Sequence, residues 1–318
     1  MSAVVGVGLL GLGTVGSAVA RVLSERAKLI EAAAGRPVRL VGACVRDAAK
    51  ARPVDVPTTA DPFEILDDPE VALVVEVIGG VDPALDLHLA AFERGKHVVT
   101  ANKELVAREW RTLHDAARSA RRQLRYEAAV AAAIPIVAAA RALGAVRPRV
   151  LRGLLNGTTT YICSRMETGA SFAAALAEAQ AAGYAEADPS ADVDGWDPAY
   201  KLSILASILE GRWFPPDNVR RTSLRSVTPQ DVAAAAERGK RLRYLAVADF
   251  GERATKARVG VEEVDAGSLE GRATGPQNVV TIETDLAGTL TFAGPGAGGD
   301  ATASAILGDV IAIARAER

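Results

Sequence analysis

The sequence is poor in cysteine, since its 318 residues include only Cys44 and Cys163. Neither residue belongs to a C-x-x-C pair or to the ligand spacing of a zinc site, which argues against a disulfide framework and a structural zinc. A reducing compartment, the cytoplasm, is therefore the expected location. An excess of charge is also missing, because 37 basic residues face 39 acidic ones. This balance gives no electrostatic basis for binding nucleic acid or a membrane surface, so we expect small molecules and other subunits as partners.

Long apolar runs free of charges and turns are missing as well, and none of the apolar segments reaches the length of a membrane span. The apolar residues 4–10 are not expected to be a secretory signal, because the first basic residue is Arg21 and no positive segment precedes them. A composition of 49% apolar and 24% charged residues is typical of a globular chain. The length predicts about two domains.

The most informative motif follows those apolar residues, and it reads Gly11-Leu12-Gly13-Thr14-Val15-Gly16. In a dinucleotide-binding turn, Gly11 permits the tight bend, Gly13 lets a pyrophosphate approach the backbone, and Gly16 lets helix and strand pack closely. The N–H groups of the first helical turn would face the anion. An ordinary glycine-rich turn is the alternative, but a strand before the motif and a helix over 17–23 after it favour coenzyme binding.

Valine-rich runs alternate with helical periodicity over the first 130 residues. The predicted strands are 38–45, 71–78 and 97–100, with helices 82–94 and 103–120 between them, and residues 123–130 close this part. Such alternation predicts an α/β fold, a Rossmann-type doubly wound parallel sheet.

The pattern changes at about residue 131. Helices are predicted at 131–143, 159–166, 171–182 and 197–210, and strands at 150–155, 241–248, 257–264, 279–284 and 288–292. We therefore expect a dinucleotide-binding domain over 1–130 and a second α+β domain over 131–298. The glycines of residues 294–299 lead into an apolar helix that we expect to complete the first domain as residues 299–318, with the glycine loop near the coenzyme. A plain flexible loop is an equally open interpretation.

The coenzyme type depends on the residues after the second strand. An acidic residue there binds the ribose 2′-hydroxyl of NAD, whereas an Arg accommodates the 2′-phosphate of NADP. Arg46 comes first and slightly favours NADP, while Asp47 leaves NAD or dual use open. Arg46 as a solvated loop charge is the competing interpretation.

Two lysines are candidate functional residues. Lys103 follows a buried strand, where ligands lie in open α/β sheets, and in a first helical turn the dipole opposes its charge by roughly 0.3–1 kcal/mol. A purely structural role is therefore unfavourable, although the side chain can also point into water. Lys201 stands four residues after Asp197, so both share one helix face and the carboxylate can hold the amine for proton transfer. Asp197 fits the N-cap of this helix and Pro198 its first position.

The segment before Lys201 carries five carboxylates, at Glu186, Asp188, Asp192, Asp194 and Asp197. Its spacing does not fit a calcium loop of the EF-hand type, and a solvated acidic turn would explain only Asp197. For the histidines, His88, His97 and His114, structural roles are predicted. Cys163 has an apolar helical context without a nearby base and is expected to be a buried small side chain.

These residues together resemble the homoserine dehydrogenase family over nearly the whole chain. The resemblance rests on residues 11–16, 100–103, 155–159, 183–201 and 294–299, of which 183–201 is the most specific. It implies interconversion of L-homoserine and L-aspartate 4-semialdehyde with NAD or NADP, in threonine, methionine and isoleucine biosynthesis, by a homodimer or larger assembly. It also implies that the second α+β domain, 131–298, is the catalytic, substrate-binding and dimerisation domain. The chain ends soon after Ile311, so the short form without a C-terminal regulatory domain is expected.

The resemblance also implies residue roles. Lys201 would be the acid and base, and Lys103 would lie between nicotinamide and substrate and orient the reacting oxygen. The remaining substrate contacts would be Glu186, Asp192, Asp197, Thr158 and Gly183. The coenzyme contacts would be Gly11, Gly13, Thr14, Val15, Gly16, Arg46, Gly79, Lys103 and Gly298.

The resemblance also implies a sodium ion. Carbonyls of Glu127, Val130, Ala132 and Ile134 would hold it, but residues 131–133 are alanines where the family usually has glycines. Thr160 likewise stands where the family tends to have Asn.

Two other hypotheses stay open. One is a related oxidoreductase, an aspartate or aspartate-semialdehyde dehydrogenase, of which the latter needs a nucleophilic cysteine. The other is a non-catalytic nucleotide-sensing protein, which would be expected to lack the lysines and carboxylates found here.

Overall fold

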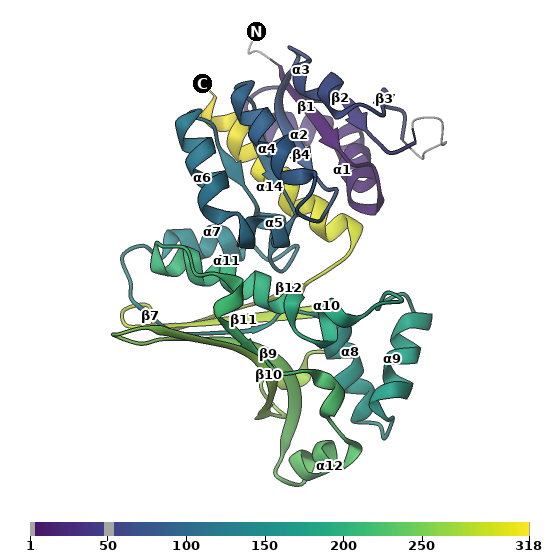
Figure 1. The fold of residues 1–318 in the computed structure, drawn as a ribbon, viewed down its shortest axis with the longest axis vertical. Coiled ribbons are helices and arrows are strands. Elements are labelled where there is room, and N and C mark those ends of the chain that lie inside the picture. Colours follow the sequence, from purple (N-terminus) through teal and green to yellow (C-terminus); the bar gives the residue numbers. More distant parts are fainter. Residues whose placement is uncertain (1–3, 48–53, 318) are drawn as a thin grey trace. The chain divides into compact units, whose positions relative to one another are not determined.

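The computed structural model describes residues 4–47 and 54–317 and divides the chain into two compact units (Figure 1). The first unit comprises residues 1–133 and 298–318, and the second comprises residues 134–297. Residues 1–3 and 318, the ends of the predicted dinucleotide-binding domain, lie outside the described residues, as do residues 48–53. Within the described ranges no helix has the length and apolar character needed to cross a membrane.

The first unit is built on a parallel sheet. Its strands are β1 (Val5–Leu10), β2 (Val38–Cys44), β3 (Thr58–Thr59), β4 (Val71–Glu76), β5 (His97–Thr100) and β6 (Leu124–Arg125). They are ordered β3-β2-β1-β4-β5-β6, and every neighbouring pair is parallel. The strand order reverses between β1 and β4, which confirms the predicted doubly wound sheet and marks its ligand-binding edge at the carboxyl ends of these strands.

Short helices connect these strands. They are α1 (Thr14–Glu25), α2 (Ala27–Ala34), α3 (Pro62–Asp67), α4 (Ala84–Glu93), α5 (Lys103–Arg108), α6 (Trp110–Ser119) and the 3-10 turn η1 (Glu127–Ala129). The prediction of one helix over 103–120 is wrong, because Glu109, with φ −102° and ψ 28°, separates α5 from α6. The Trp110 ring packs against His114, with centroids 4.2 Å apart, and against Tyr126 at 5.8 Å. We attribute the break to this packing, since neither glycine nor proline marks it in the sequence.

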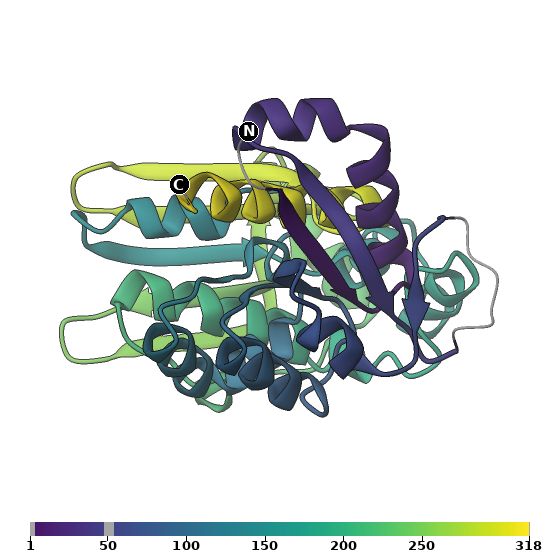
Figure 2. The same ribbon diagram turned by 90° about the horizontal axis from the view of Figure 1, so that it is seen from above.

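Helix α14 (Gly299–Ala316), the last element of the chain, belongs to the first unit. It packs against α1, and Figures 1 and 2 show it in yellow among the purple amino-terminal elements. Ile306 and Val310 are fully buried in the same apolar cluster as Val7 of β1 and Val19 of α1. The core of the first unit is therefore made from both ends of the sequence.

The second unit contains a mixed sheet of six strands. These are β7 (Pro148–Leu154), β8 (Val219–Arg221), β9 (Lys240–Phe250), β10 (Thr255–Asp265), β11 (Gln277–Thr284) and β12 (Thr289–Pro295). The order is β12-β11-β7-β9-β10-β8, antiparallel except where β10 meets β8. The β11–β12 hairpin appears yellow-green in Figure 2. The α+β class predicted for this part is confirmed.

The helices of the second unit supply most of its polar site residues. They are α7 (Ile136–Ala142), α8 (Gly157–Met166), α9 (Phe172–Ala181), α10 (Ser190–Val193), α11 (Trp196–Glu210), α12 (Pro229–Glu237), α13 (Leu269–Arg272) and the 3-10 turns η2 (Pro216–Asn218) and η3 (Leu224–Ser226). The predicted helix 131–143 begins only at Ile136. Its expected start is prevented because Ala131 and Ala132 adopt positive φ values of 55° and 42°.

The N-cap of α11 is Gly195, so the prediction that Asp197 caps this helix is wrong. Gly195 has φ 85°, and a Cβ there would come within 2.6 Å of the Tyr244 hydroxyl. Only glycine fits both the left-handed backbone and the close approach. Asp197 therefore lies inside the first turn, and its carboxylate is used elsewhere.

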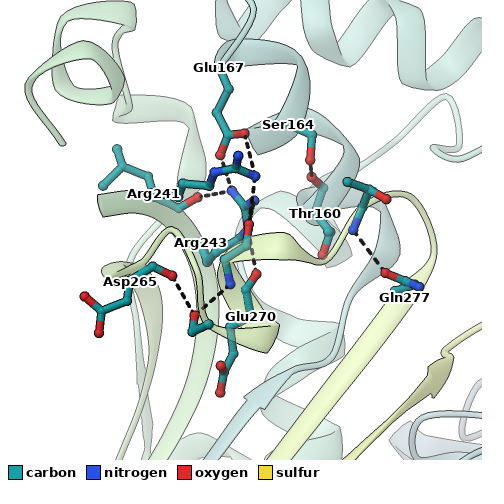
Figure 3. A network of polar contacts seen from close by, with 12 residues as sticks. Thr160, Ser164, Glu167, Arg241, Arg243, Asp265, Glu270 and Gln277 are labelled. Carbon is teal, nitrogen blue, oxygen red and sulfur yellow. Dashed lines mark hydrogen bonds and ion pairs between the residues drawn. The ribbon is translucent and has the colours of Figure 1, made fainter. Parts of the chain in front are cut away.

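A buried arginine joins three elements of the second unit, as Figure 3 shows. Arg243 of β9 is fully buried and forms an ion pair with Glu167, the C-cap residue of α8. Its guanidinium also donates to the carbonyls of Glu270 at 3.0 Å and Gly271 at 2.6 Å in α13. These bonds fix the carboxyl end of α8 against the sheet.

Candidate active site

The turn between β1 and α1 has the backbone that the glycine motif predicts. Gly11 has φ 104°, and its N–H donates to the Cys44 carbonyl at 2.9 Å. A Cβ on Gly16 would lie 2.1 Å from the Gly11 oxygen, whereas no described atom lies within 4 Å of a Cβ built on Gly13. Gly16 thus permits close packing, and Gly13 faces open space. No described side chain caps the amino end of α1, where Thr14 and Val15 begin the helix, so its N–H groups suit an anion.

The second glycine-rich segment lies beside this turn. Gly298 is the N-cap of α14 with φ 115°, and a Cβ on Gly299 would be 3.3 Å from Thr14. Arg21 of α1 and Asp300 of α14 form an ion pair at 2.5 Å. The first unit therefore brings Gly298 and Gly299 to the amino-terminal glycine motif, although 281 residues lie between Gly16 and Gly298.

Glu76, a residue that the sequence analysis did not single out, organises the end of β4. It is fully buried and accepts hydrogen bonds from the backbone N–H groups of Ile78 at 2.6 Å and Gly79 at 3.2 Å. Thr100 donates to it at 2.7 Å, and His88 Nε2 lies 3.2 Å away. The available signal was one carboxylate within the apolar run 71–78.

The pKa of Glu76 reflects this environment. Burial works to raise the pKa, but the hydrogen bonds and charge of His88, with those of Thr100 and the Ile78 N–H, outweigh it and hold the pKa below its usual value. The carboxylate is thus kept ionised inside the unit. It shapes the loop that carries Gly79, which has φ 81°.

Asn102 connects that loop to Lys103. Its Oδ1 accepts from the Leu105 N–H at 3.1 Å as the N-cap of α5, and its Nδ2 donates to the Gly80 carbonyl at 2.6 Å. Lys103, the first residue of α5, therefore directly follows a residue that is bonded to the loop after β4.

The two residues considered for coenzyme selection lie just after β2. Arg46 and Asp47 are both exposed there.

Lys201 is the centre of a buried polar cluster in the second unit. Its Nζ donates to Asp197 Oδ2 and to the Leu155 carbonyl, each at 2.7 Å. Asp197 is 6% exposed and Lys201 9%, so water screens this ion pair little. The i,i+4 spacing of the two residues on α11 produces the predicted contact.

Asn156 joins this cluster to a second carboxylate, and the sequence analysis gave it no role. Its Nδ2 donates to Asp192 Oδ1 at 2.6 Å and to Asp197 Oδ2 at 2.9 Å. Its Oδ1 accepts from the Thr159 N–H at 2.9 Å, which makes it the N-cap of α8. The signal in the sequence was an Asn directly before the segment Gly157-Thr158-Thr159.

The pKa of Asp192 is raised by its surroundings. Burial and the charge of Asp197 raise the pKa of Asp192, while hydrogen bonds from Asn156 and Thr158 and the charge of Lys201 act in the opposite direction. Thr158 also donates to the Tyr184 carbonyl at 2.6 Å, which ties α8 to the loop after α9. A second cationic group beside Asp192, such as a substrate ammonium, would favour its ionised form.

The five carboxylates of the acidic segment do not act as one group. Asp188 accepts from the Ser190 N–H, and Asp194 pairs with Arg225, so both order the loop. Glu186 is exposed, as is Gly183, and no hydrogen bond or ion pair among the described residues joins the Glu186 side chain to Asp192, Asp197 or Lys201. Only Asp192 and Asp197 of the segment are brought to Lys201.

His97 and His114 bind neighbouring groups of the first unit, and both cysteines are buried. His97 is bonded to the Gln123 N–H and to Glu317, and His114 to the Trp110 carbonyl and the Tyr126 hydroxyl. Burial raises the pKa of the Cys163 thiol to about 12, so almost no thiolate is present near neutral pH. The described residues include no group of three or more His, Cys, Asp or Glu side chains suited to a metal.

Known proteins resemble the chain over both units. Residues 135–311 match the family model described as homoserine dehydrogenase, and residues 11–127 match the homoserine dehydrogenase NAD-binding domain. The homoserine dehydrogenase of Mycobacterium tuberculosis is 42% identical over 319 residues, which cover 98% of this chain and 72% of that protein.

Solved structures agree with the sequence relatives. A homoserine dehydrogenase from Thiobacillus denitrificans has a TM-score of 0.96 at 41% identity, covering 98% of this chain and 74% of that one. A hyperthermophilic archaeal homoserine dehydrogenase in complex with NADPH has a TM-score of 0.83 at 25% identity, covering 97% of each chain.

Proposed function

The chain belongs to the homoserine dehydrogenase family, and we propose that Lys201 is the acid and base of its reaction. The protein is an NAD(P)-dependent oxidoreductase that interconverts L-homoserine and L-aspartate 4-semialdehyde, a step of amino-acid biosynthesis. A bound nicotinamide would accept a hydride from, or supply one to, the substrate carbon that bears the reacting oxygen, C4 of homoserine. The protein must therefore exchange a proton with the oxygen on that carbon.

The observation that carries the proposal is the fixed position of the Lys201 amine. A buried carboxylate and a backbone carbonyl each hold it at 2.7 Å. An ammonium in this position gives its proton to the aldehyde oxygen as the hydride arrives at C4. In the oxidation of homoserine, the neutral amine takes the hydroxyl proton as the hydride leaves.

The other site residues fit supporting roles. Asp192 would bind the substrate ammonium, Asp197 would hold Lys201, and Lys103 would orient the reacting oxygen. Thr158 and Gly183 would contact the substrate beside them. Glu186 is retained in this set from the family resemblance, and its exposed position leaves it accessible to a ligand.

For the coenzyme, we propose NADP as the preferred form with NAD as an alternative. The contacts would come from Gly11, Gly13, Thr14, Val15, Gly16, Arg46, Gly79, Lys103 and Gly298. The open space at Gly13 and the uncapped first turn of α1 support a pyrophosphate there. The exposed Arg46 at the end of β2 supports a 2′-phosphate contact.

Three further properties are proposals, the first two carried over from the family and the third inferred from the cysteine content. A sodium ion would be held by carbonyls of Glu127, Val130, Ala132 and Ile134, and the positive φ of Ala132 supports this because alanine there reproduces a glycine-like backbone. A homodimer or a higher homo-oligomer is proposed as the assembly. Location in the cytoplasm is supported by Cys44 and Cys163, which are free thiols.

The test is the growth of reduced-coenzyme absorbance when purified protein is mixed with L-homoserine and NADP or NAD. Lys201→Ala is expected to lower kcat by roughly 100-fold or more, because general acid–base catalysis contributes about that factor. Lys240→Ala is the matched control, since Lys240 is paired with Asp265 at the surface of β9. Turnover retained in Lys201→Ala would disprove the assigned role.

An aspartate-semialdehyde dehydrogenase is the weaker alternative. That chemistry needs a cysteine thiolate, and neither cysteine offers one, because burial raises the pKa of both thiols. Activity with homoserine that survives thiol modification would separate the two reactions.

A further inference from the structure

Asn278 is a buried polar residue of β11 that has no assigned role. It is 1% exposed, and its Nδ2 donates to the Leu155 carbonyl at 3.3 Å. The same carbonyl accepts the hydrogen bond from Lys201 Nζ at 2.7 Å. Asn278 therefore binds the same carbonyl oxygen that holds Lys201, the proposed acid and base.

The other end of the Asn278 amide is unfavourable for stability. Within the described part of the chain, its buried Oδ1 has no hydrogen-bond partner. A buried carbonyl without a donor loses its hydration and gains nothing in return. An apolar side chain of similar shape would avoid this cost. A role for Asn278 must therefore come from the hydrogen bond that its Nδ2 donates.

The Leu155 carbonyl needs such a donor because no regular element fixes it. Strand β7 ends at Leu154, and Asn156 is the N-cap of α8, so the Leu155 peptide lies between the last strand residue and the first helical turn. Two side chains, Lys201 and Asn278, donate to its oxygen. Because a carbonyl oxygen has two lone pairs, the second donor can fix the direction of the oxygen without displacing the amine.

Gly296 makes the space for this amide. A Cβ built on Gly296 would lie 2.1 Å from both Cγ and Oδ1 of Asn278. The Gly296 N–H donates to the Pro276 carbonyl at 2.9 Å, so the backbone cannot easily move away. Close approach to Asn278 therefore requires glycine at this position.

We propose that Asn278 is a positioning residue that holds the Leu155 carbonyl toward Lys201, and that Gly296 is required because it gives room to the Asn278 amide. This inference rests on the role of Lys201 proposed above. It also gives one glycine of the 294–299 motif a function apart from coenzyme binding.

The first test replaces the amide by a side chain of nearly equal size. Asn278→Leu removes both the donor and the unpaired oxygen, so Tm is expected to stay equal or rise. Misplacement of the catalytic amine is expected to lower kcat by roughly 10-fold or more, with KM for homoserine and the Kd for NADPH changed by less than about 2-fold. Gln277→Leu, on the exposed side of the same strand, is the control and should leave kcat unchanged.

A second variant gives a pH signature that a merely structural role would not. In Asn278→Asp a protonated carboxyl can still donate to the Leu155 oxygen, whereas the ionised form repels it. The ratio of variant kcat to wild-type kcat is therefore expected to fall as the pH rises. The same ratio for Asn278→Leu should be independent of pH.

The steric part of the inference is tested by combining substitutions. Gly296→Ala should lower kcat as Asn278→Leu does, because the new Cβ displaces the amide. In an Asn278→Ala background the obstacle is gone, so adding Gly296→Ala should change kcat by less than about 2-fold.

The failures of the two proposals are distinguishable. If Lys201→Ala abolishes turnover while Asn278→Leu and Gly296→Ala keep wild-type kcat, Lys201 retains its role and the positioning role of Asn278 is wrong. The positioning role would also be wrong if the Asn278 variants have a lower Tm but an unchanged kcat, and if the ratio of Asn278→Asp kcat to wild-type kcat does not change with pH. If Lys201→Ala keeps turnover, the proposed function fails first.

Discussion

Individual polar residues inside apolar surroundings are held in place by several partners in this protein. Burying a charge is costly unless a partner and hydrogen bonds compensate it. Lys201 has Asp197 and a carbonyl, and Glu76 has two backbone N–H groups, a hydroxyl and His88. Each of these residues is therefore held in one position, as a reacting or ligand-shaping group requires.

Arg46 is expected to decide between the coenzymes. Loss of a charged contact to the 2′-phosphate in Arg46→Ala should raise the Kd for NADPH by roughly 10-fold or more and leave that for NADH nearly unchanged. Titration of coenzyme fluorescence measures both constants. Arg26→Ala, another exposed arginine of the first unit, serves as control. An equal change for both coenzymes would contradict a 2′-phosphate contact.

Glu76 is expected to make the first unit sensitive to acid. Because its folded pKa lies below the usual value, its stabilising contribution is complete above about pH 4.3 and is lost as the pH falls through the folded pKa. Glu76→Gln should therefore lose roughly 2 kcal/mol of unfolding free energy near neutral pH. The difference from wild type should shrink toward acid pH in thermal melts. Glu93→Gln, exposed on α4, should match wild type at every pH.

Among the elements, α8 connects the candidate site to the body of the second unit. Its amino end begins with Asn156, which binds both carboxylates of the Lys201 cluster. Its carboxyl end is tied through Glu167 to the buried Arg243 (Figure 3). The position of the site residues thus depends on contacts at both ends of this helix.

Removing Glu167 should leave the Arg243 charge buried with only carbonyl partners. We expect Glu167→Ala to lower the unfolding free energy by about 2–3 kcal/mol in urea titrations. Glu263→Ala removes a partner of the exposed Arg238 and should change stability little. Equal losses in the two variants would contradict a special role of the buried pair.

At the scale of the whole molecule, the first unit is discontinuous in sequence. Its parallel sheet comes from the first 133 residues, while α14 from the end of the chain supplies buried residues such as Ile306 and Val310. The second unit is inserted between these two parts. Folding of the first unit therefore depends on both ends of the polypeptide.

A fragment test follows from this arrangement. Residues 1–133 alone should aggregate or stay unfolded and bind no NADPH, because the face that α14 covers is apolar. Residues 1–133 joined by a flexible linker to 298–318 should regain coenzyme binding, measured by NADPH fluorescence. Binding by the shorter fragment would show that α14 is dispensable for the coenzyme site.

The sequence by itself determined the features that depend on neighbouring residues. The glycines of residues 11–16 demand a particular backbone, valine-rich runs form buried parallel strands, and the spacing of Asp197 and Lys201 places both on one helix face. Homoserine dehydrogenase membership also followed from such motifs. Only the tertiary structure decided which distant residues meet them. It broke a predicted helix at Glu109, capped α11 with Gly195 in place of Asp197, and brought Asn156 to the carboxylates of Asp192 and Asp197. The bond from Asn278 to Leu155 spans 123 residues and depends on the register of β7 with β11, which no local pattern encodes.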